Sequence, residues 1–210
     1  MKHSSFMSHT IVRSSPPHKP DYKDYRPDLE SDFNKRCAYC NLHMHSITTS
    51  FEIDHFIPRS VFKNVRPDLE NDYNNLMLSC KKCNSAKGAK FHGDIGAEQV
   101  SNTRFYDPVT VNLNTVFYRN EYGTIQSDDL KGRSMIRDIK LYRHIHALGW
   151  ICEQISATIE RLRHCIESEA SPERKELLTQ ALNMMNDQYV KKNQVFIARY
   201  NDPDFSIESI

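Results

Sequence analysis

Three short stretches decide the fold of this chain: Cys37-Ala-Tyr-Cys40, Glu52-Ile-Asp-His-Phe-Ile-Pro58, and Cys80-Lys-Lys-Cys83 with the Asn84-Ser-Ala-Lys87 that follows it. Each CxxC pair places two thiolates on one tight turn, and two such turns make a tetrahedral four-cysteine site. Four sulfur ligands suit zinc in a closed, structural role. The sequence therefore predicts one structural Zn²⁺ bound by Cys37, Cys40, Cys80 and Cys83.

The spacing of the two pairs predicts a folded insert between them. Residues 41–79 separate the pairs, whereas common zinc ribbons use roughly 15–20 residues. We expect the metal to hold the two ends of this insert, so that folding depends on it. The alternative is that the two pairs are unrelated redox or buried cysteines. Cys152 and Cys165 lie in a helical pattern, where cysteine is more often packed than metal-bound.

Composition excludes several classes of protein. The chain has 210 residues with 28 basic and 27 acidic side chains, for a net charge of +1, so bulk charge alone does not explain nucleic-acid binding. The sequence contains no run of about 18 apolar residues, so it predicts no membrane span. The N-terminus shows no apolar leader pattern. We therefore expect a cytoplasmic protein whose six cysteines are reduced or metal-bound rather than paired in disulfides.

The pattern along the chain predicts three regions. Residues 1–34 read as a polar arm in which Pro16, Pro17, Pro20 and Pro27 interrupt any helix. Residues 35–126 hold the motifs and then, over 103–126, partly alternating residues typical of strands or a hairpin. Residues 127–210 are helical in pattern.

The helical region predicts two long helices. One apolar stripe runs from Met135 to Ile166 at spacings of three and four, which favours a single long helix with Gly149 inside it. Ser171-Pro172-Glu173 is typical of a helix start, and a second helix follows. We expect a helical hairpin. Four aromatic side chains of the first 40 residues are expected to fix the arm to a core: Tyr22, Tyr25, Phe33 and Tyr39.

The motifs together resemble those of the HNH endonucleases, whose zinc-bearing members follow the pattern CxxC…DHxxP…NL…CxxCxxxK. The resemblance covers about residues 35–92, and His55, Asn75 and Asn84 fill the three positions of an HNN variant. It implies a ββα-metal core, two strands and a helix around one catalytic ion. The expected fold class is α+β: this core with its zinc site, then a hairpin region and a long C-terminal helical hairpin.

The residue types fit phosphodiester hydrolysis. His55 titrates near neutrality and can take a proton from water. Asp54 and Asn84 offer hard oxygen ligands, which suit Mg²⁺ or Mn²⁺. By resemblance, Asn75 orients the His55 ring through a hydrogen bond. Because adjacent side chains of a regular strand point to opposite faces, Asp54 and His55 are expected at a strand end or bulge, which Pro58 would mark.

The same segment is locally basic. Residues 35–90 hold nine Lys or Arg and five acidic residues, which favours a focused phosphate site. The residues predicted to contact nucleic acid are Lys81, Lys82, Lys87, Lys90 and Arg59. For Lys81 and Lys82, a solvated turn with no ligand is the alternative.

The resemblance implies a metal-dependent endonuclease, and the expected substrate is DNA rather than RNA. The alternative from another class is a non-catalytic zinc-bound module that binds nucleic acid or protein. In arrangement and size the chain is also similar, more weakly, to the HNH effectors of prokaryotic antiviral defence that act with an ATPase. That similarity implies a protein partner, docked on the helical region, that restrains or activates the nuclease.

Overall fold

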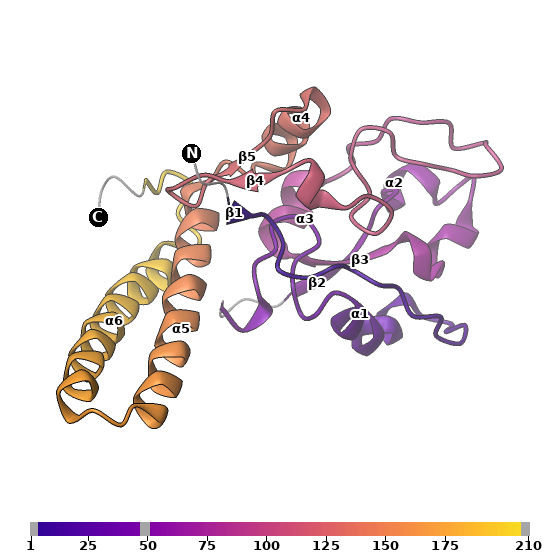
Figure 1. Ribbon diagram of the computed structural model, residues 1–210. Coiled ribbons are helices and arrows are strands. Elements are labelled where there is room, and N and C mark those ends of the chain that lie inside the picture. The colour runs from indigo at the N-terminus through magenta and orange to yellow at the C-terminus, as the bar shows by residue number, and fades with distance from the viewer. Residues whose placement is uncertain (1–3, 47–50, 207–210) are drawn as a thin grey trace. The chain divides into compact units, whose positions relative to one another are not determined.

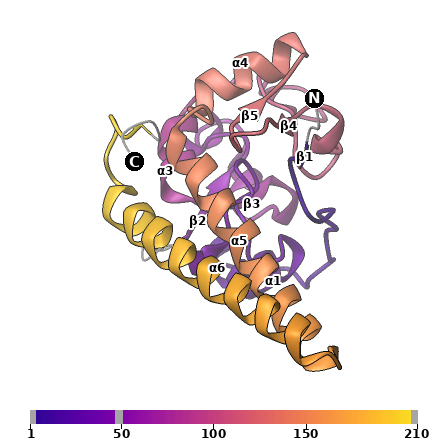
Figure 2. The ribbon, with the colours of Figure 1, turned by 60° about the vertical axis from the view of Figure 1, so that its left-hand side comes forward.

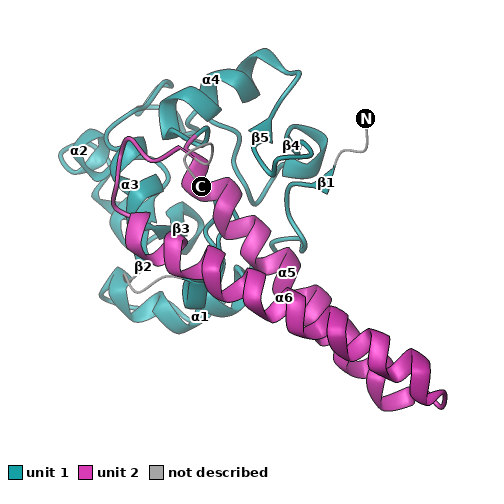
Figure 3. Cartoon of the chain, turned by 90° about the vertical axis from the view of Figure 1, so that its left-hand side faces the viewer, with its two compact units in different colours: residues 1–142 teal, residues 143–210 magenta. Residues whose placement is uncertain are grey.

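The computed structural model describes residues 4–46 and 51–206, and it divides into two compact units (Figures 1 and 3). The first unit is Met1–Tyr142 and the second is Arg143–Ile210. All the motifs of the sequence lie in the first unit. Within the described part of the chain, no helix is long and apolar enough to cross a membrane.

A ββα unit lies at the centre of the first unit. Strands β2 (Phe51–His55) and β3 (Leu76–Cys80) pair antiparallel, with Phe51 opposite Cys80 and His55 opposite Leu76. All five residues of β3 are buried, as expected for a short apolar strand packed on both faces. Helix α3 (Lys81–Lys87) begins directly after β3. The two strands and the helix of the expected ββα core are therefore present, and its metal ion stays a prediction.

The part of the insert that lies between the two strands, residues 56–75, folds over the end of β2. It contains helix α2 (Arg59–Phe62) and the 3₁₀ turns η3 (Pro67–Glu70) and η4 (Tyr73–Asn75). Ile57, Phe62 and Leu69 form a small buried cluster in it. Pro58 is the N-cap residue of α2 and lies outside β2. The strand therefore ends before Pro58, as the sequence indicated.

The N-terminal arm forms a helix that the proline argument missed. The arm runs from β1 (Ser4–Ser5) to η1 (Tyr22–Tyr25) and α1 (Arg26–Asp32), and η2 (Met44–Ser46) follows the first CxxC. Pro27 stands in the first turn of α1, where a missing N–H breaks no helical bond. Tyr25, Phe33 and Tyr39 are buried, which confirms that aromatic side chains fix this region to the core.

The expected strands over 103–126 are confirmed only in their second half. Strands β4 (Tyr118–Arg119) and β5 (Ile125–Gln126) form a hairpin, and β1 adds to β4 in the order β1-β4-β5. The stretch before them folds as turns and η5 (Leu113–Thr115). Side chains of Asp107 and Asn112 accept hydrogen bonds from backbone N–H groups two residues on, and such turns compete with strand pairing.

The predicted single helix of the C-terminal region is wrong, because the chain forms α4 (Leu130–Ile139) and α5 (His144–Ser168) there. Lys140 closes α4 in the left-handed conformation at φ +59°, and Leu141 N–H bonds back to the Ile136 carbonyl. This C-cap geometry leaves the spacing of the apolar stripe unchanged, so the stripe could not reveal it. Gly149 lies within α5.

The second unit is the expected helical hairpin. Helices α5 and α6 (Pro172–Arg199) run side by side, joined by a short loop (Figures 1 and 2). Ser171 caps α6 by accepting a hydrogen bond from Arg174 N–H, as its sequence predicted.

Candidate active site and metal centre

The four cysteines of the two CxxC pairs form one buried cluster. The Sγ atoms of Cys37, Cys40, Cys80 and Cys83 all lie within 4.8 Å of one another, and those of Cys40 and Cys80 are 3.9 Å apart. A Zn–S distance of about 2.3 Å in a tetrahedron requires sulfurs about 3.8 Å apart. The cluster therefore fits a single structural zinc ion.

The local backbone and the burial of the thiols support a cation here. Cys80 ends β3 and Cys83 lies in the first turn of α3, so strand and helix position that pair. Burial raises the pKa of the Cys40 thiol well above its ordinary value. Burial acts in the same direction on Cys37, but hydrogen bonds from the other three cysteines outweigh it and lower the pKa of Cys37. A metal binds cysteine as thiolate, and four buried thiolates side by side would need a positive ion to be stable.

His55 is held at the end of β2 with one nitrogen occupied. Its Nε2 lies 2.9 Å from the carbonyl oxygen of Glu70, and a carbonyl only accepts, so Nε2 carries the hydrogen. The rings of Tyr22 and Phe62 lie 4.8 and 5.5 Å from the imidazole. Burial lowers the pKa of His55, against the opposing effect of the Glu70 carbonyl. The neutral ring thus has its lone pair on Nδ1.

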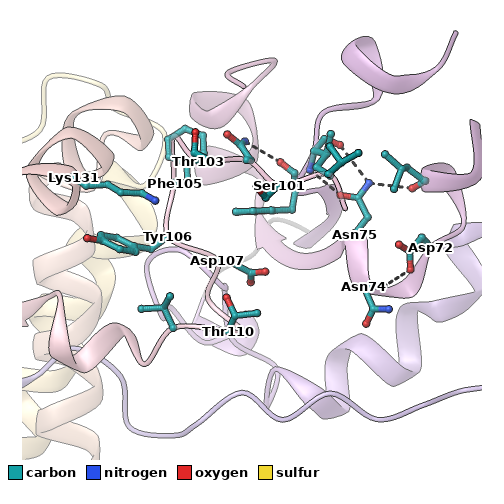
Figure 4. A pocket seen from close by; sticks show the side chains of 16 residues that line it. Asp72, Asn74, Asn75, Ser101, Thr103, Phe105, Tyr106, Asp107, Thr110 and Lys131 are labelled. Carbon is teal, nitrogen blue, oxygen red and sulfur yellow. Dashed lines mark hydrogen bonds between the residues drawn. The ribbon is translucent and has the colours of Figure 1, made fainter. Parts of the chain in front are cut away.

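Asn75 acts on the insert rather than directly on the imidazole (Figure 4). Its Oδ1 accepts from Ile57 N–H at 2.8 Å, and its Nδ2 donates to the carbonyls of Leu69, at 3.0 Å, and Ile57, at 3.4 Å. The expected hydrogen bond to the ring is therefore replaced by an indirect link. Asn75 fixes Leu69, and the next carbonyl, that of Glu70, holds His55.

Asp54 is buried and has partners on both carboxylate oxygens. Tyr39 donates to Oδ2 at 2.5 Å, and the Lys87 ammonium lies 2.9 Å from Oδ1. Lys87 is 0% exposed and also donates to the His55 carbonyl at 2.7 Å. Burial raises the pKa of Asp54, and Lys87 and then Tyr39 oppose that rise.

A cavity of about 270 Å³ brings three of the predicted catalytic residues together: Asp54, His55 and Asn84 line it, with Arg59 and Gly88. His55 is the last residue of β2, so the expectation that this pair lies at a strand end is met. Asn84 comes from α3 and donates through Nδ2 to Glu52 at 2.7 Å. Asn75 lines a different cavity, of about 430 Å³, together with Asp72 and Asn74 (Figure 4).

The predicted nucleic-acid contacts differ in exposure. Lys81 and Arg59 are exposed, and Arg59 forms an ion pair with Glu70. Lys82 is half-buried. Lys90 is half-buried and donates to the Ala86 carbonyl near the end of α3. Lys87 faces inward to Asp54, so a phosphate contact by its ammonium needs that ion pair to open. The phosphate contacts stay predictions.

Two site residues were missed from the sequence. Tyr39 was expected only to fix the arm, yet its hydroxyl reaches Asp54, and its place inside the first CxxC was the available signal. Glu70 accepts the hydrogen bond of His55 through its backbone carbonyl. The type of side chain at residue 70 does not reveal such a contact.

Comparison with known proteins gives one similarity, which covers the residues of this site. The family model described as HNH endonuclease matches residues 37–90, from the first cysteine of the cluster to just beyond α3. No curated protein and no solved structure matches the chain. Residues 37–90 are therefore similar to the HNH endonucleases, as their motifs indicated.

Proposed function

We propose that this protein is a metal-dependent endonuclease that hydrolyses phosphodiester bonds, in DNA rather than RNA. The observation that supports this most is the state of His55. Its ring is neutral, oriented through Nε2, and placed beside Asp54 and Asn84 in one cavity. The family match of the surrounding residues supports the same reaction class.

In the proposed reaction, His55 Nδ1 takes a proton from water as the water oxygen attacks phosphorus. The bond to the leaving oxygen breaks, and that oxygen takes a proton from solvent water. A divalent ion, Mg²⁺ or Mn²⁺, would supply the positive charge that stabilises the phosphorane-like transition state and the leaving oxygen. Asp54 and Asn84 would hold it. Each oxygen of Asp54 has a second lone pair besides the one used by Lys87 or Tyr39, and Asn84 Oδ1 accepts while its Nδ2 is bound to Glu52.

The test is cleavage by the purified, zinc-loaded protein. Plasmid DNA and total RNA are incubated with Mg²⁺, with Mn²⁺ or with EDTA, beside a His55→Ala variant whose zinc content is measured. We expect metal-dependent cleavage that His55→Ala lowers at least a hundredfold. The variant His18→Ala is the matched control, because His18 is exposed and does not line the cavity of His55. Cleavage that survives His55→Ala equally well would overturn the catalytic assignment.

We further propose that the protein is a cytoplasmic, defence-type effector controlled by a partner of the ATPase kind. The helical hairpin supports this part, since α6 exposes large apolar side chains, among them Leu177, Met184 and Ile197. Exposed apolar side chains are a feature of surfaces that bind partner proteins. Purification of the native complex tests the idea, and a protein that runs alone and cuts without help would contradict it.

A further inference from the structure

A third cavity, separate from that of Asn75, adjoins the cavity of His55 on the side of the N-terminal arm. It measures about 430 Å³ and is lined by Tyr22, Lys23, Arg26, Glu52, Ile53 and Asn84. Ile53 and Asn84 line both cavities, so the two are neighbours along one face of β2. Three of the six lining residues come from the arm, which lies outside the segment that matches the HNH family.

Hydrogen bonds before and after Tyr22 and Lys23 in the sequence fix the arm to the core. Arg26 Nη1 donates to the Phe51 carbonyl of β2 at 2.7 Å. Asn71 of the insert donates to the Pro20 carbonyl at 2.8 Å. The wall that the arm adds is therefore preformed, which spares a ligand the cost of ordering it.

The side chains of the wall have the chemistry of a nucleotide site. Tyr22 is half-buried, and its ring meets the His55 ring in a T-shaped contact at 4.8 Å. Lys23 is exposed, with its nearest carboxylate, Asp21, 3.9 Å away and itself half exposed. Such a pair contributes little, so the ammonium can exchange it for a phosphate. Glu52 also lines the cavity and accepts a hydrogen bond from Asn84, so a bound phosphate would lie toward Lys23 and away from this carboxylate.

We propose that Tyr22 and Lys23 form a subsite for the nucleotide next to the scissile phosphate, with Lys23 on its phosphate and the Tyr22 ring against its base or sugar. An aromatic ring beside a cation binds a nucleic-acid strand without regard to sequence. The position of the subsite rests on the proposed function, because the shared Asn84 joins it to the cavity of His55.

A binding measurement tests this subsite separately from catalysis. The affinity of a short fluorescein-labelled DNA duplex is measured in the His55→Ala background with Mg²⁺, at several salt concentrations. Lys23→Ala should lower the slope of log Kd against log salt by about one. Tyr22→Ala should raise Kd roughly five- to a hundredfold, and Tyr22→Phe should keep the parent Kd. Lys175→Ala is the control, an exposed lysine of α6 that lines neither cavity.

The outcomes of the two proposals are distinguishable. In the protein that keeps His55 and cleaves DNA, Tyr22→Ala and Lys23→Ala should raise KM more than they lower kcat. If the Tyr22 ring merely supported His55, Tyr22→Ala would lower kcat alone. Unchanged Kd and salt slope in both variants would overturn the subsite while parent cleavage leaves the endonuclease standing. A parent that binds but never cuts would overturn only the endonuclease. A parent that binds no DNA would overturn the subsite.

Discussion

The phenol of Tyr39 donates a 2.5 Å hydrogen bond to Asp54 Oδ2. Tyr39 stands between Cys37 and Cys40 in the first CxxC, and Asp54 stands beside His55 on β2. One side chain therefore joins the first CxxC turn to strand β2. The cysteine cluster thus does more than hold the ends of the insert, since it also sets the position of a carboxylate in the cavity of His55.

Tyr39→Phe should separate these two roles. The ring stays, so the zinc content should be unchanged, but a buried hydrogen bond to a carboxylate contributes about 1.5–3 kcal/mol. We expect a lower free energy of unfolding by about that amount and at least a tenfold loss of cleavage. Urea unfolding, zinc analysis and the plasmid assay measure the three quantities. Tyr106→Phe is the control, because its hydroxyl bonds to Asp129 at the surface. Equal behaviour of the two variants would contradict the link.

The buried ion pair of Lys87 and Asp54 makes a second prediction. Removing one partner leaves an uncompensated buried charge, which costs about 3–5 kcal/mol. Lys87→Met should therefore lower the free energy of unfolding by about that much, and adding Asp54→Asn should restore a large part of it. Lys191→Met, which breaks the surface pair with Asp187, should change it by less than about 1 kcal/mol. A double variant no more stable than Lys87→Met would refute the pairing.

Asn75 should behave as a positioning residue. Asn75→Ala leaves the buried N–H of Ile57 and the carbonyl of Leu69 without their partner, at a cost of about 1–3 kcal/mol. Because the insert then holds His55 less firmly through Glu70, kcat should fall at least tenfold while KM changes little. Steady-state cleavage kinetics measure both. A rise in KM with kcat intact would mean that Asn75 binds the substrate instead.

The sequence predicts what is encoded by residue type at fixed spacing. Two CxxC pairs determine the cluster, and Asp54-His55 followed by Pro58 determines a strand end. The sequence predicts a direct hydrogen bond from Asn75 to His55, but the backbone carbonyl of Glu70 holds the ring instead. Because every residue type has a backbone carbonyl, the sequence could not reveal this contact. The break at Lys140 was hidden for a similar reason, since a left-handed φ changes no side chain of the apolar stripe.

Thiol reactivity tests the division of the six cysteines. Cys165 is exposed, whereas burial raises the pKa of Cys152 to about 11, so at pH 8 only about a thousandth of Cys152 is thiolate. In the zinc-loaded protein we expect a disulfide reagent to modify Cys165 quickly and Cys152 slowly. Removing zinc with a chelator should expose the four cysteines of the cluster to the reagent and lower the melting temperature, because metal binding contributes to folding. Cys165→Ser should abolish the fast phase and leave the zinc content as it was. Fast reaction of the four cluster cysteines before any chelator is added would mean that they do not hold a metal.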